Sequence, residues 1–242
     1  MRQRDQVYRD PKNQIVDFAF DDRVADVFPD MIRRSVPGYE TVIPMTGLLA
    51  ARHLQQTPDV TARAYDLGCS LGATTMALLK ALGNDPCEVF AVDNAESMIQ
   101  RAATSITDPR VQFLCADVRG LDFKPAGAVL LNYVLQFLPP DDRLALLRRI
   151  RSALVPDGLL ILSEKVHFDD PQDDAFYDAV HLDYKRANGY SELEISQKRS
   201  ALENVMIIDT EAVHRKRFRN AGFTRVRKWY QCLNWASFLV SP

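Results

Sequence analysis

A glycine-rich segment early in the chain has residue types suited to binding a ligand through its backbone. Residues 65–72 read Tyr-Asp-Leu-Gly-Cys-Ser-Leu-Gly and follow a short apolar run. Gly68 lets the backbone approach a ligand without a Cβ clash, and the helix expected after the loop begins with unpaired N–H groups. Asp66 precedes the first glycine, where a carboxylate would repel a pyrophosphate. The segment therefore predicts a loop for a ligand with a cationic ammonium or sulfonium group.

Two more acids stand where later apolar runs end. Asp93 lies 21 residues after Gly72, and an acid at the end of a second strand accepts hydrogen bonds from ribose hydroxyls. Asp117 and Val118 follow the third run and could bracket an adenine edge. Each feature alone has a plainer explanation, as a tight-turn glycine or a helix-capping acid. Acids at three successive strand ends favour a nucleoside site, because parallel strands end at one edge of the sheet.

The spacing of apolar residues predicts the elements that would bring these loops together. Short strands alternate with helices, and strands that are apolar on both faces are typical of a parallel sheet covered on two sides. The predicted strands cover 63–67, 88–92, 111–116, 128–133 and 159–163, and the helices cover 73–82, 97–105 and 140–154. Two later runs, 224–231 and 234–240, predict an antiparallel pair at the sheet edge. Residues 172–221 are helical in pattern, without a strand candidate.

The whole chain is predicted to be one α/β domain of Rossmann-like type. Its predicted parts are a helical N-terminal cap (1–54), a nucleoside-binding core (63–165), a helical insertion (166–222) and closing strands (223–242). The chain has 242 residues, of which 47% are hydrophobic and 26% charged, and this composition excludes wholesale disorder. The net charge of −2 argues against a protein that coats nucleic acid through bulk charge.

The cysteines and the polar N-terminus predict a cytoplasmic protein without a membrane segment. No apolar run approaches the roughly 18 residues that span a bilayer, and the first residues lack the apolar core of a secretory signal. The cysteines are not spaced as C-x-x-C, so free thiols in a reducing compartment are expected. Cys69 has no basic neighbour and is expected to pack rather than react. The histidines are scattered, so no metal site is expected.

The loop and strand-end acids together resemble the class I S-adenosylmethionine-dependent methyltransferases. The resemblance implies a mostly parallel sheet with helices on both faces and an antiparallel C-terminal strand pair. It implies that Asp66 and the glycine loop hold the methionine part of S-adenosylmethionine, Asp93 the ribose, and Asp117 with Val118 the adenine. The further binding residues that it implies are Gly68, Cys69, Ser70 and Asn94. Ser70 stands where many members of that superfamily have glycine.

Three other stretches narrow the resemblance to the carboxy-S-adenosyl-L-methionine synthase family. They are residues 22–39, 132–138 and 185–206. The resemblance implies that S-adenosylmethionine and prephenate yield carboxy-S-adenosylmethionine, phenylpyruvate and water. It also implies that the product serves a partner enzyme that modifies the wobble uridine of transfer RNA, and that the chain is a homodimer that need not bind transfer RNA itself.

This narrower resemblance supplies three more site residues. Arg199 would hold the new carboxylate, because a guanidinium pairs with carboxylates through two parallel hydrogen bonds. Charge pattern alone would make Arg199 a surface residue of a helix. Tyr39 and Asn132 carry over as ligand contacts, and their plainer explanations are a core aromatic and a strand-end turn residue. Arg199 is the expected reaction-side residue, with no general base, which fits a substrate-assisted route. The candidate prephenate contacts, left unranked, are Arg33, Arg34, Lys185 and Arg186.

Two other functions remain open from the sequence. A conventional methyltransferase acting on RNA or a small molecule could share the fold, because a fold does not fix a function. A basic strip at 215–228, with seven basic residues and no acid, could face RNA, although a solvated helix face and a charge-protected edge strand explain it more simply. A nucleoside-binding scaffold without turnover is the non-enzymatic alternative.

Overall fold

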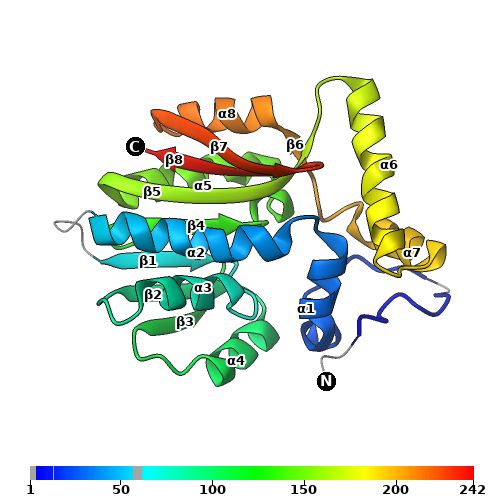
Figure 1. The fold of residues 1–242 in the computed structure, drawn as a ribbon, viewed down its shortest axis with the longest axis horizontal. Helices are drawn as coiled ribbons and strands as arrows, with labels where there is room; N and C mark the ends of the chain where they lie inside the picture. The colour runs from blue at the N-terminus through cyan, green and yellow to red at the C-terminus, as the bar shows by residue number, and fades with distance from the viewer. Residues whose placement is uncertain (1–3, 13, 57–61) are drawn as a thin grey trace.

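The computed structural model describes residues 4–12, 14–56 and 62–242, and a single sheet organises them. The strand order is β3-β2-β1-β4-β5-β8-β7, and β6 pairs with β5 off this path. Strands β1 to β5 run parallel, whereas β8 is antiparallel to both β5 and β7 (Figure 1). The strands are β1 (Arg63–Leu67), β2 (Glu88–Asp93), β3 (Val111–Cys115), β4 (Ala126–Asn132), β5 (Leu154–His167), β6 (Asp209–Thr210), β7 (Arg225–Cys232) and β8 (Trp235–Ser241). The predicted sheet and its antiparallel C-terminal pair are confirmed.

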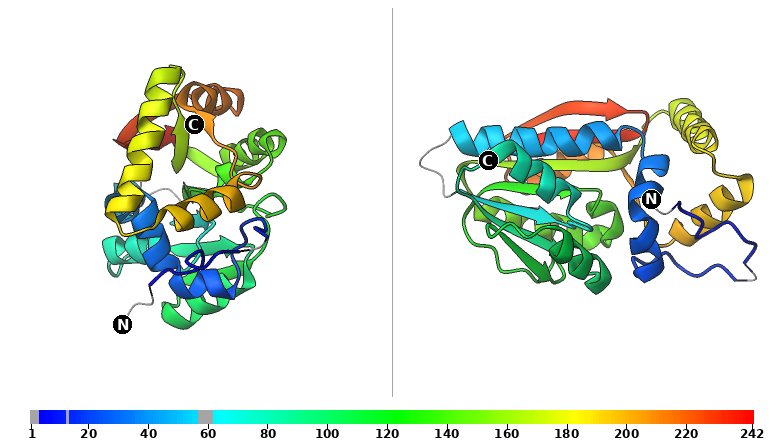
Figure 2. Two further views of the ribbon diagram at one scale, coloured as in Figure 1. Left: turned by 90° about the vertical axis from the view of Figure 1, so that its right-hand side faces the viewer. Right: turned by 60° about the horizontal axis from the view of Figure 1, so that its bottom comes forward.

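Helices cover both faces of this sheet, and a separate group stands beyond its edge. One face carries α2 and α3, and the other carries α5 and α8 (Figures 1 and 2). Helices α1, α6 and α7 gather beyond the carboxyl ends of the parallel strands. The helices are α1 (Asp22–Ser35), α2 (Tyr39–Gln56), α3 (Ala73–Leu82), α4 (Glu96–Ser105), α5 (Pro140–Ala153), α6 (Pro171–Ala187), α7 (Glu192–Leu202) and α8 (Glu211–Asn220), with a 3₁₀ turn at Leu135–Phe137.

The middle of β4 shows why a continuous apolar run forms a strand here. Every residue of β4 is buried. Ala128 and Leu130 belong to the apolar cluster beneath α2 and α3, whereas Val129 and Leu131 belong to the cluster beneath α5 and α8. Because successive side chains of a strand point to opposite faces, a strand covered on both faces needs apolar residues throughout.

Two sequence predictions about strands are wrong. The fifth strand extends well beyond 159–163 at both ends. β5 is longer because its end pairs with β8 and β6 as well as with β4. Strand β6 lies in a region predicted to have none. Its two residues pair with Val166 and His167, and a strand that short has no readable alternation.

The N-terminal region differs from a simple helical cap. Residues 4–12 and 14–21 contain no helix, and α1 begins at Asp22 after Asp21 accepts the backbone N–H of Val24. Helix α2 is not part of a cap, because Ala50, Ala51 and Leu54 pack into the main core with α3. Of the predicted cap, α1 lies beyond the strand ends, whereas α2 lies along the sheet (Figure 1).

The structure also bears on the predictions about the cysteines and about membrane segments. None of the four cysteines forms a disulfide. Within the described ranges, no helix combines the length and the apolarity needed to cross a bilayer.

Candidate functional site

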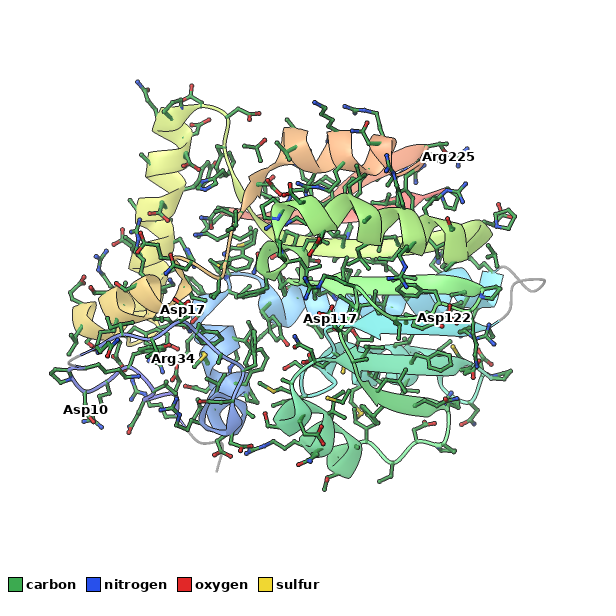
Figure 3. All side chains as sticks on the ribbon, turned by 180° about the vertical axis from the view of Figure 1, so that it is seen from behind. Asp10, Asp17, Arg34, Asp117, Asp122 and Arg225 are labelled. Carbon is green, nitrogen blue, oxygen red and sulfur yellow. The ribbon has the colours of Figure 1, made fainter. Side chains whose placement is uncertain are left out.

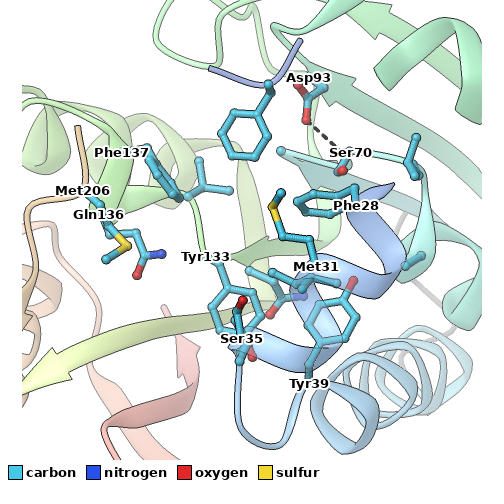
Figure 4. Close-up of a pocket in the computed structure, with 18 of the residues that line it drawn as sticks. Phe28, Met31, Ser35, Tyr39, Ser70, Asp93, Tyr133, Gln136, Phe137 and Met206 are labelled. Atoms are coloured by element: carbon cyan, nitrogen blue, oxygen red, sulfur yellow. Dashed lines mark hydrogen bonds between the residues drawn. The ribbon is translucent and has the colours of Figure 1, made fainter. Parts of the chain in front are cut away.

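A cavity of about 1040 Å³ opens at the carboxyl ends of the parallel strands. Figure 4 shows Asp93 and Ser70 toward one end and Ser35 and Tyr133 toward the other, with Met31 between them. Loops after β1, β2, β3 and β4 form the first end, which we call the nucleoside end. Helices α1, α6 and α7 contribute to the opposite side. The sheet thus supplies one half of the site and the helices beyond it supply the other.

The glycine loop lines the nucleoside end in a strained, left-handed backbone conformation. Gly68 has a φ of 69°, and its N–H and that of Cys69 donate to the carbonyl of Val92 at 2.8 and 3.0 Å. A Cβ at Gly68 would collide with the side chain of Val134. Ser70 also has a positive φ, 50°, which is uncommon for a residue with a side chain. The loop is therefore fixed against β2, and glycine at 68 is a steric requirement.

Asp93 holds the loop and keeps hydrogen-bonding capacity for a ligand. Its two carboxylate oxygens accept the N–H groups of Ser70 and Ala95, each at 2.9 Å. A carboxylate oxygen has two lone pairs, so each can accept another donor, such as a ribose hydroxyl. Burial raises the pKa of Asp93, and the backbone N–H groups oppose that rise. The position at the end of β2 matches the sequence prediction.

Asp66 lies behind the cavity wall instead of on it. The cavity lining does not include Asp66, and its side chain is buried and accepts the hydroxyl of Thr75 at 2.7 Å. Burial raises the pKa of Asp66 to about 6. The carboxylate of Asp66 thus binds Thr75 in the first turn of α3, next to the loop. Its direct contact with a ligand stays a prediction.

Asp117 and its neighbours line the cavity next to β3. Asp117 is paired with Arg119 at 2.6 Å, and this ion pair holds the pKa of Asp117 below its usual range. Arg119 also pairs with Asp142 at 2.8 Å. Asn94 and Val118 are also in the wall. Arg119, two residues further along the chain, therefore already binds the carboxylate of Asp117. The predicted hydrogen bond from an adenine amine to Asp117 stays untested.

Asn132 and Tyr39 both line the cavity, as the resemblance implies. The amide nitrogen of Asn132 lies 3.4 Å from the hydroxyl oxygen of Thr74, and its buried oxygen Oδ1 has no partner among the described residues. Tyr39 faces Tyr133 with the ring centroids 6.2 Å apart, and burial raises the pKa of Tyr39 above its usual range. An unpaired buried amide oxygen favours a bound donor at this position.

Arg199 does not line the cavity of its own chain. Its side chain is 67% exposed and lies 3.5 Å from Asp178 on α6. Of the four candidate prephenate contacts, Arg33 and Lys185 are in the wall and Arg34 and Arg186 are not. Arg34 pairs with Asp30, and Arg186 pairs with Glu192 and Asp183.

Sequence reasoning missed most of the wall opposite the nucleoside end. This wall includes Lys165, His181, Lys198 and Trp235 in addition to Lys185. Lys165 stands near the end of β5, where a ligand-facing residue is plausible in a parallel sheet. The other missed residues carry no local signal, because they come from helices and from an antiparallel strand.

Glu164 positions the loop that joins the two halves. Its fully buried carboxylate accepts the N–H groups of Val134, Leu135 and Gln136 at 3.0, 2.8 and 3.1 Å. Burial raises the pKa of Glu164 to about 8, although the three N–H groups oppose the rise. The loop carries Tyr133, whose φ of 63° places its ring in the wall.

Acidic residues pair with three of the seven basic residues in the strip at 215–228. Arg215 and Lys228 both pair with Glu211 at 2.7 Å, and Arg217 pairs with Asp209 at 2.8 Å. These contacts support the interpretation of a helix face and a charged edge strand. Among the described residues, no group of three or more His, Cys, Asp or Glu side chains is arranged to hold a metal ion.

Comparisons with known proteins first define the class. Residues 64–158 match the model of a methyltransferase domain. The fold resembles human N-acetylserotonin methyltransferase, solved with SAM, at a TM-score of 0.63 and 14% identity over 91% of this chain and 55% of that one. It also resembles an O-methyltransferase family protein from Burkholderia thailandensis, at a TM-score of 0.66 and 16% identity over 92% and 60% of the two chains. The protein has the methyltransferase-type Rossmann-like fold, as predicted.

Relatives at higher identity define the family. Carboxy-S-adenosyl-L-methionine synthase of Pseudomonas putida (strain W619) is 49% identical over 100% of this chain and 99% of its own length. The protein of that name from Geobacter sp. (strain M21) is 47% identical over 99% and 98% of the two chains. The chain belongs to the carboxy-S-adenosyl-L-methionine synthase family, which confirms the resemblance read from the sequence.

Proposed function

We propose that this chain converts S-adenosylmethionine and prephenate to carboxy-S-adenosylmethionine, phenylpyruvate and water. The observation that carries the proposal is the full-length match to relatives named for that product, which includes residues 166–222 as well as the methyltransferase core. In the structure α6 and α7, which belong to that segment, form part of the cavity wall. The segment that distinguishes this chain from a bare nucleoside-binding domain is therefore part of the site.

The nucleoside end would hold S-adenosylmethionine through the residues already described. We assign the ribose to Asp93, the adenine to the wall formed by Asn94, Asp117 and Val118, and the methionine part to the loop of Gly68, Cys69 and Ser70, with Asp66 behind it. Asn132 and Tyr39 would face the methionine and sulfonium part. The fit is supported by the free lone pairs of Asp93, the unpaired Oδ1 of Asn132 and the close approach that Gly68 allows.

The proposed reaction balances without a group from outside the two substrates. Prephenate loses carbon dioxide and hydroxide and becomes phenylpyruvate. The hydroxide takes one proton from the sulfonium methyl group to give water, and a carbon–carbon bond forms between that methyl carbon and the carbon dioxide. The chain would orient the two substrates, exclude water and stabilise the charges that develop.

We assign Arg199 to the new carboxylate and propose that it acts across a homodimer. Its exposed side chain lies outside the wall of its own cavity, so it is available to a second subunit. An Arg199→Ala variant should lose most carboxylation and retain S-adenosylmethionine binding. In an equal mixture with an Asp93→Ala chain, at an S-adenosylmethionine concentration too low to load the Asp93→Ala site, it should regain about a quarter of wild-type activity, because half of the dimers would contain one intact site. Arg199→Ala with wild-type carboxylation would overturn the assignment, and mixtures without recovery would overturn the action across subunits.

The function itself is tested by the mass of the small molecule that the purified protein releases on denaturation. A species heavier than S-adenosylmethionine by one carbon dioxide supports the proposal, as does phenylpyruvate formed on adding prephenate. Only S-adenosylmethionine or its demethylated product would favour a conventional methyltransferase. Tight ligand binding without turnover of prephenate would favour the scaffold.

We propose a cytoplasmic location for the protein. We also propose that its link to transfer RNA runs through its product alone, and the pairing of basic-strip residues with acids supports this link.

A further inference from the structure

Three lysines from three consecutive elements of the chain line the cavity wall opposite the nucleoside end. Lys165 lies on β5, Lys185 on α6 and Lys198 on α7, and all three line the cavity. We call these three residues the lysine wall. Lys198 is only 8% exposed, and the side chain of Lys165 is only 11% exposed.

The lysine wall has too little negative charge beside it to balance three ammonium groups. Lys165 lies 3.7 Å from Asp178, a carboxylate that Arg199 also approaches at 3.5 Å. Lys198 donates to the hydroxyl oxygen of Ser35 at 2.9 Å, which is a neutral partner, and the buried carboxylate of Asp5 is the acid whose charge acts on it. Lys185 forms no hydrogen bond and no ion pair among the described residues. Because buried charges in proteins are normally paired, this arrangement favours the binding of an anion here.

The titration behaviour of these groups agrees with the geometry. Burial lowers the pKa of Lys185 to about 7, and the charges of Lys198 and Lys165 lower it further in the same direction. Burial also lowers the pKa of Lys198 to about 8. Burial and the neighbouring lysines lower the pKa of His181 to about 3, so this imidazole adds no positive charge at neutral pH. An anion in the cavity would remove this repulsion and favour the charged lysines.

Aromatic side chains beside the lysine wall add flat apolar surface and two unused donors. The rings of Tyr133 and Trp235 lie 5.3 Å apart, and Trp235 lies 5.8 Å from His181. The Tyr133 hydroxyl and the Trp235 Nε1 are buried and have no hydrogen-bond partner among the described residues. Both residues line the cavity. A ligand here would present a ring to the aromatic surface and acceptor oxygens to the donors.

We propose that the lysine wall, with Tyr133 and Trp235, binds the second substrate, and that this substrate is a dicarboxylate with an unsaturated ring. The proposal rests on the proposed function and assigns prephenate to this side of the cavity. One carboxylate would lie on Lys185 and Lys198, the ring against Trp235, and the second carboxylate toward Tyr133 and the nucleoside end. Lys165 would set the charge of the site while bound to Asp178. Figure 4 shows Tyr133 and Ser35 on the side of the cavity away from Asp93, which leaves the region between them for the reacting groups.

A binding role and a structural role for the lysines predict different changes in the stability of the ligand-free protein when a lysine is replaced. A buried ammonium without a countercharge lowers stability, so replacing Lys185 by a residue of similar length and no charge should not reduce the stability of the ligand-free protein. A lysine that serves only the fold would reduce it when replaced. The change in stability therefore separates a binding role from a structural one.

The test measures prephenate binding by calorimetry to protein saturated with S-adenosylhomocysteine, which permits no turnover. Lys185→Met and Lys198→Met should weaken prephenate binding about 10- to 100-fold. Lys185→Arg should recover most of the affinity. The matched control is Lys216→Met, an exposed residue of α8 outside the cavity. S-adenosylhomocysteine binding should change less than about threefold in every variant, and the melting temperature of Lys185→Met should equal or exceed that of the wild type.

The outcomes separate this inference from the proposed function. Wild-type turnover together with unchanged prephenate binding in Lys185→Met and Lys198→Met would overturn the inference and leave the function standing. Lysine-dependent prephenate binding without carboxylation would support the inference and overturn the function. Prephenate binding no tighter than that of acetate at equal ionic strength would overturn the inference. If Lys198→Met does not fold, Lys185→Met and Lys185→Arg decide the question.

Discussion

The two sides of the cavity are built in different ways. At the nucleoside end, the backbone N–H groups of Gly68, Cys69 and Ser70 fix the loop by donating to the carbonyl of Val92 and to the carboxylate of Asp93 on β2. On the lysine wall, the charged groups come from the three consecutive elements β5, α6 and α7, and Lys185 forms no hydrogen bond or ion pair with another described residue, although the charge of Asp178 acts on it. The loop of the first side is held by its own hydrogen bonds, whereas the second side carries three lysines whose charge an anion would balance.

The nucleoside end and the lysine wall also differ in how widely their construction is shared among α/β proteins. The nucleoside end uses the carboxyl ends of parallel strands, which many α/β proteins use for ligands. The lysine wall depends on α6 and α7, which the methyltransferase-domain match at 64–158 does not include. We infer that the sheet selects the nucleoside and the helices beyond it select the reaction.

We expect the largest effect from replacing Glu164, which holds the loop that both sides of the cavity share. Glu164→Ala would leave three buried N–H groups without an acceptor and should lower the free energy of unfolding by about 3–5 kcal/mol. Urea denaturation monitored by circular dichroism measures this change. Binding at both sides should weaken, because the loop carries Tyr133 next to the strand end at Asn132.

Glu164→Gln serves as the matched variant. Its amide keeps one acceptor oxygen, so its loss of stability should lie between zero and that of Glu164→Ala. A loss below about 1 kcal/mol in the alanine variant would show that the three hydrogen bonds do not hold the loop.

The second-largest effect should be confined to the nucleoside end of the cavity. Asp93→Ala removes the acceptors that position the loop and face the ribose, so S-adenosylmethionine should bind about 10- to 100-fold more weakly. Prephenate affinity should change by less than about threefold in protein saturated with S-adenosylhomocysteine. Calorimetry measures both affinities.

The control for this variant is Asp122→Ala. Asp122 is an exposed acid on the connection between β3 and β4, and Figure 3 shows it at the other end of the sheet from Asp117. It should leave both affinities unchanged. Equal losses in Asp93→Ala and Asp122→Ala would mean that overall charge, not the position of Asp93, controls binding.

The smallest effect concerns pH. The pKa of Lys185 is lowered to about 7, so its ammonium is lost as the pH rises through 7, and a dianion binds the protonated form more tightly. Prephenate affinity should therefore fall a few-fold between pH 6 and 8.5. The neighbours that set this behaviour are Lys165, Lys198, Asp178 and Arg199.

Binding of S-adenosylhomocysteine, measured over the same pH range, provides the comparison. It should vary less than prephenate binding, because the lysine wall lies on the opposite side of the cavity from the nucleoside end. In Lys185→Met the fall in prephenate affinity should flatten. The same slope in wild type and Lys185→Met would assign the pH dependence to another group.

The sequence predicted the sheet accurately because its signals are local. Each strand of the core is an apolar run that stops at a polar residue, and the strand ends at Leu67, Asp93 and Cys115 agree with the prediction to within a residue. The full length of β5 and the existence of β6 were missed, because pairing with distant strands extends β5 past its apolar run. The burial of Asp66 behind the loop was missed for a similar reason, since its partner Thr75 stands on α3.

The sequence by itself determined the family of the chain and the edge of the sheet at which the cavity opens. Strands and helices that alternate in sequence form right-handed parallel units, so acids at successive strand ends meet at one edge without further information. Only the tertiary structure decided that Arg199 lies outside its own cavity and that three lysines line it. Their convergence depends on the docking of α6 and α7 onto Ser35, whose carbonyl and hydroxyl contact His181 and Lys198, 146 and 163 residues along the chain. Contacts at such separations follow from how whole elements pack, and no local pattern of residues encodes them.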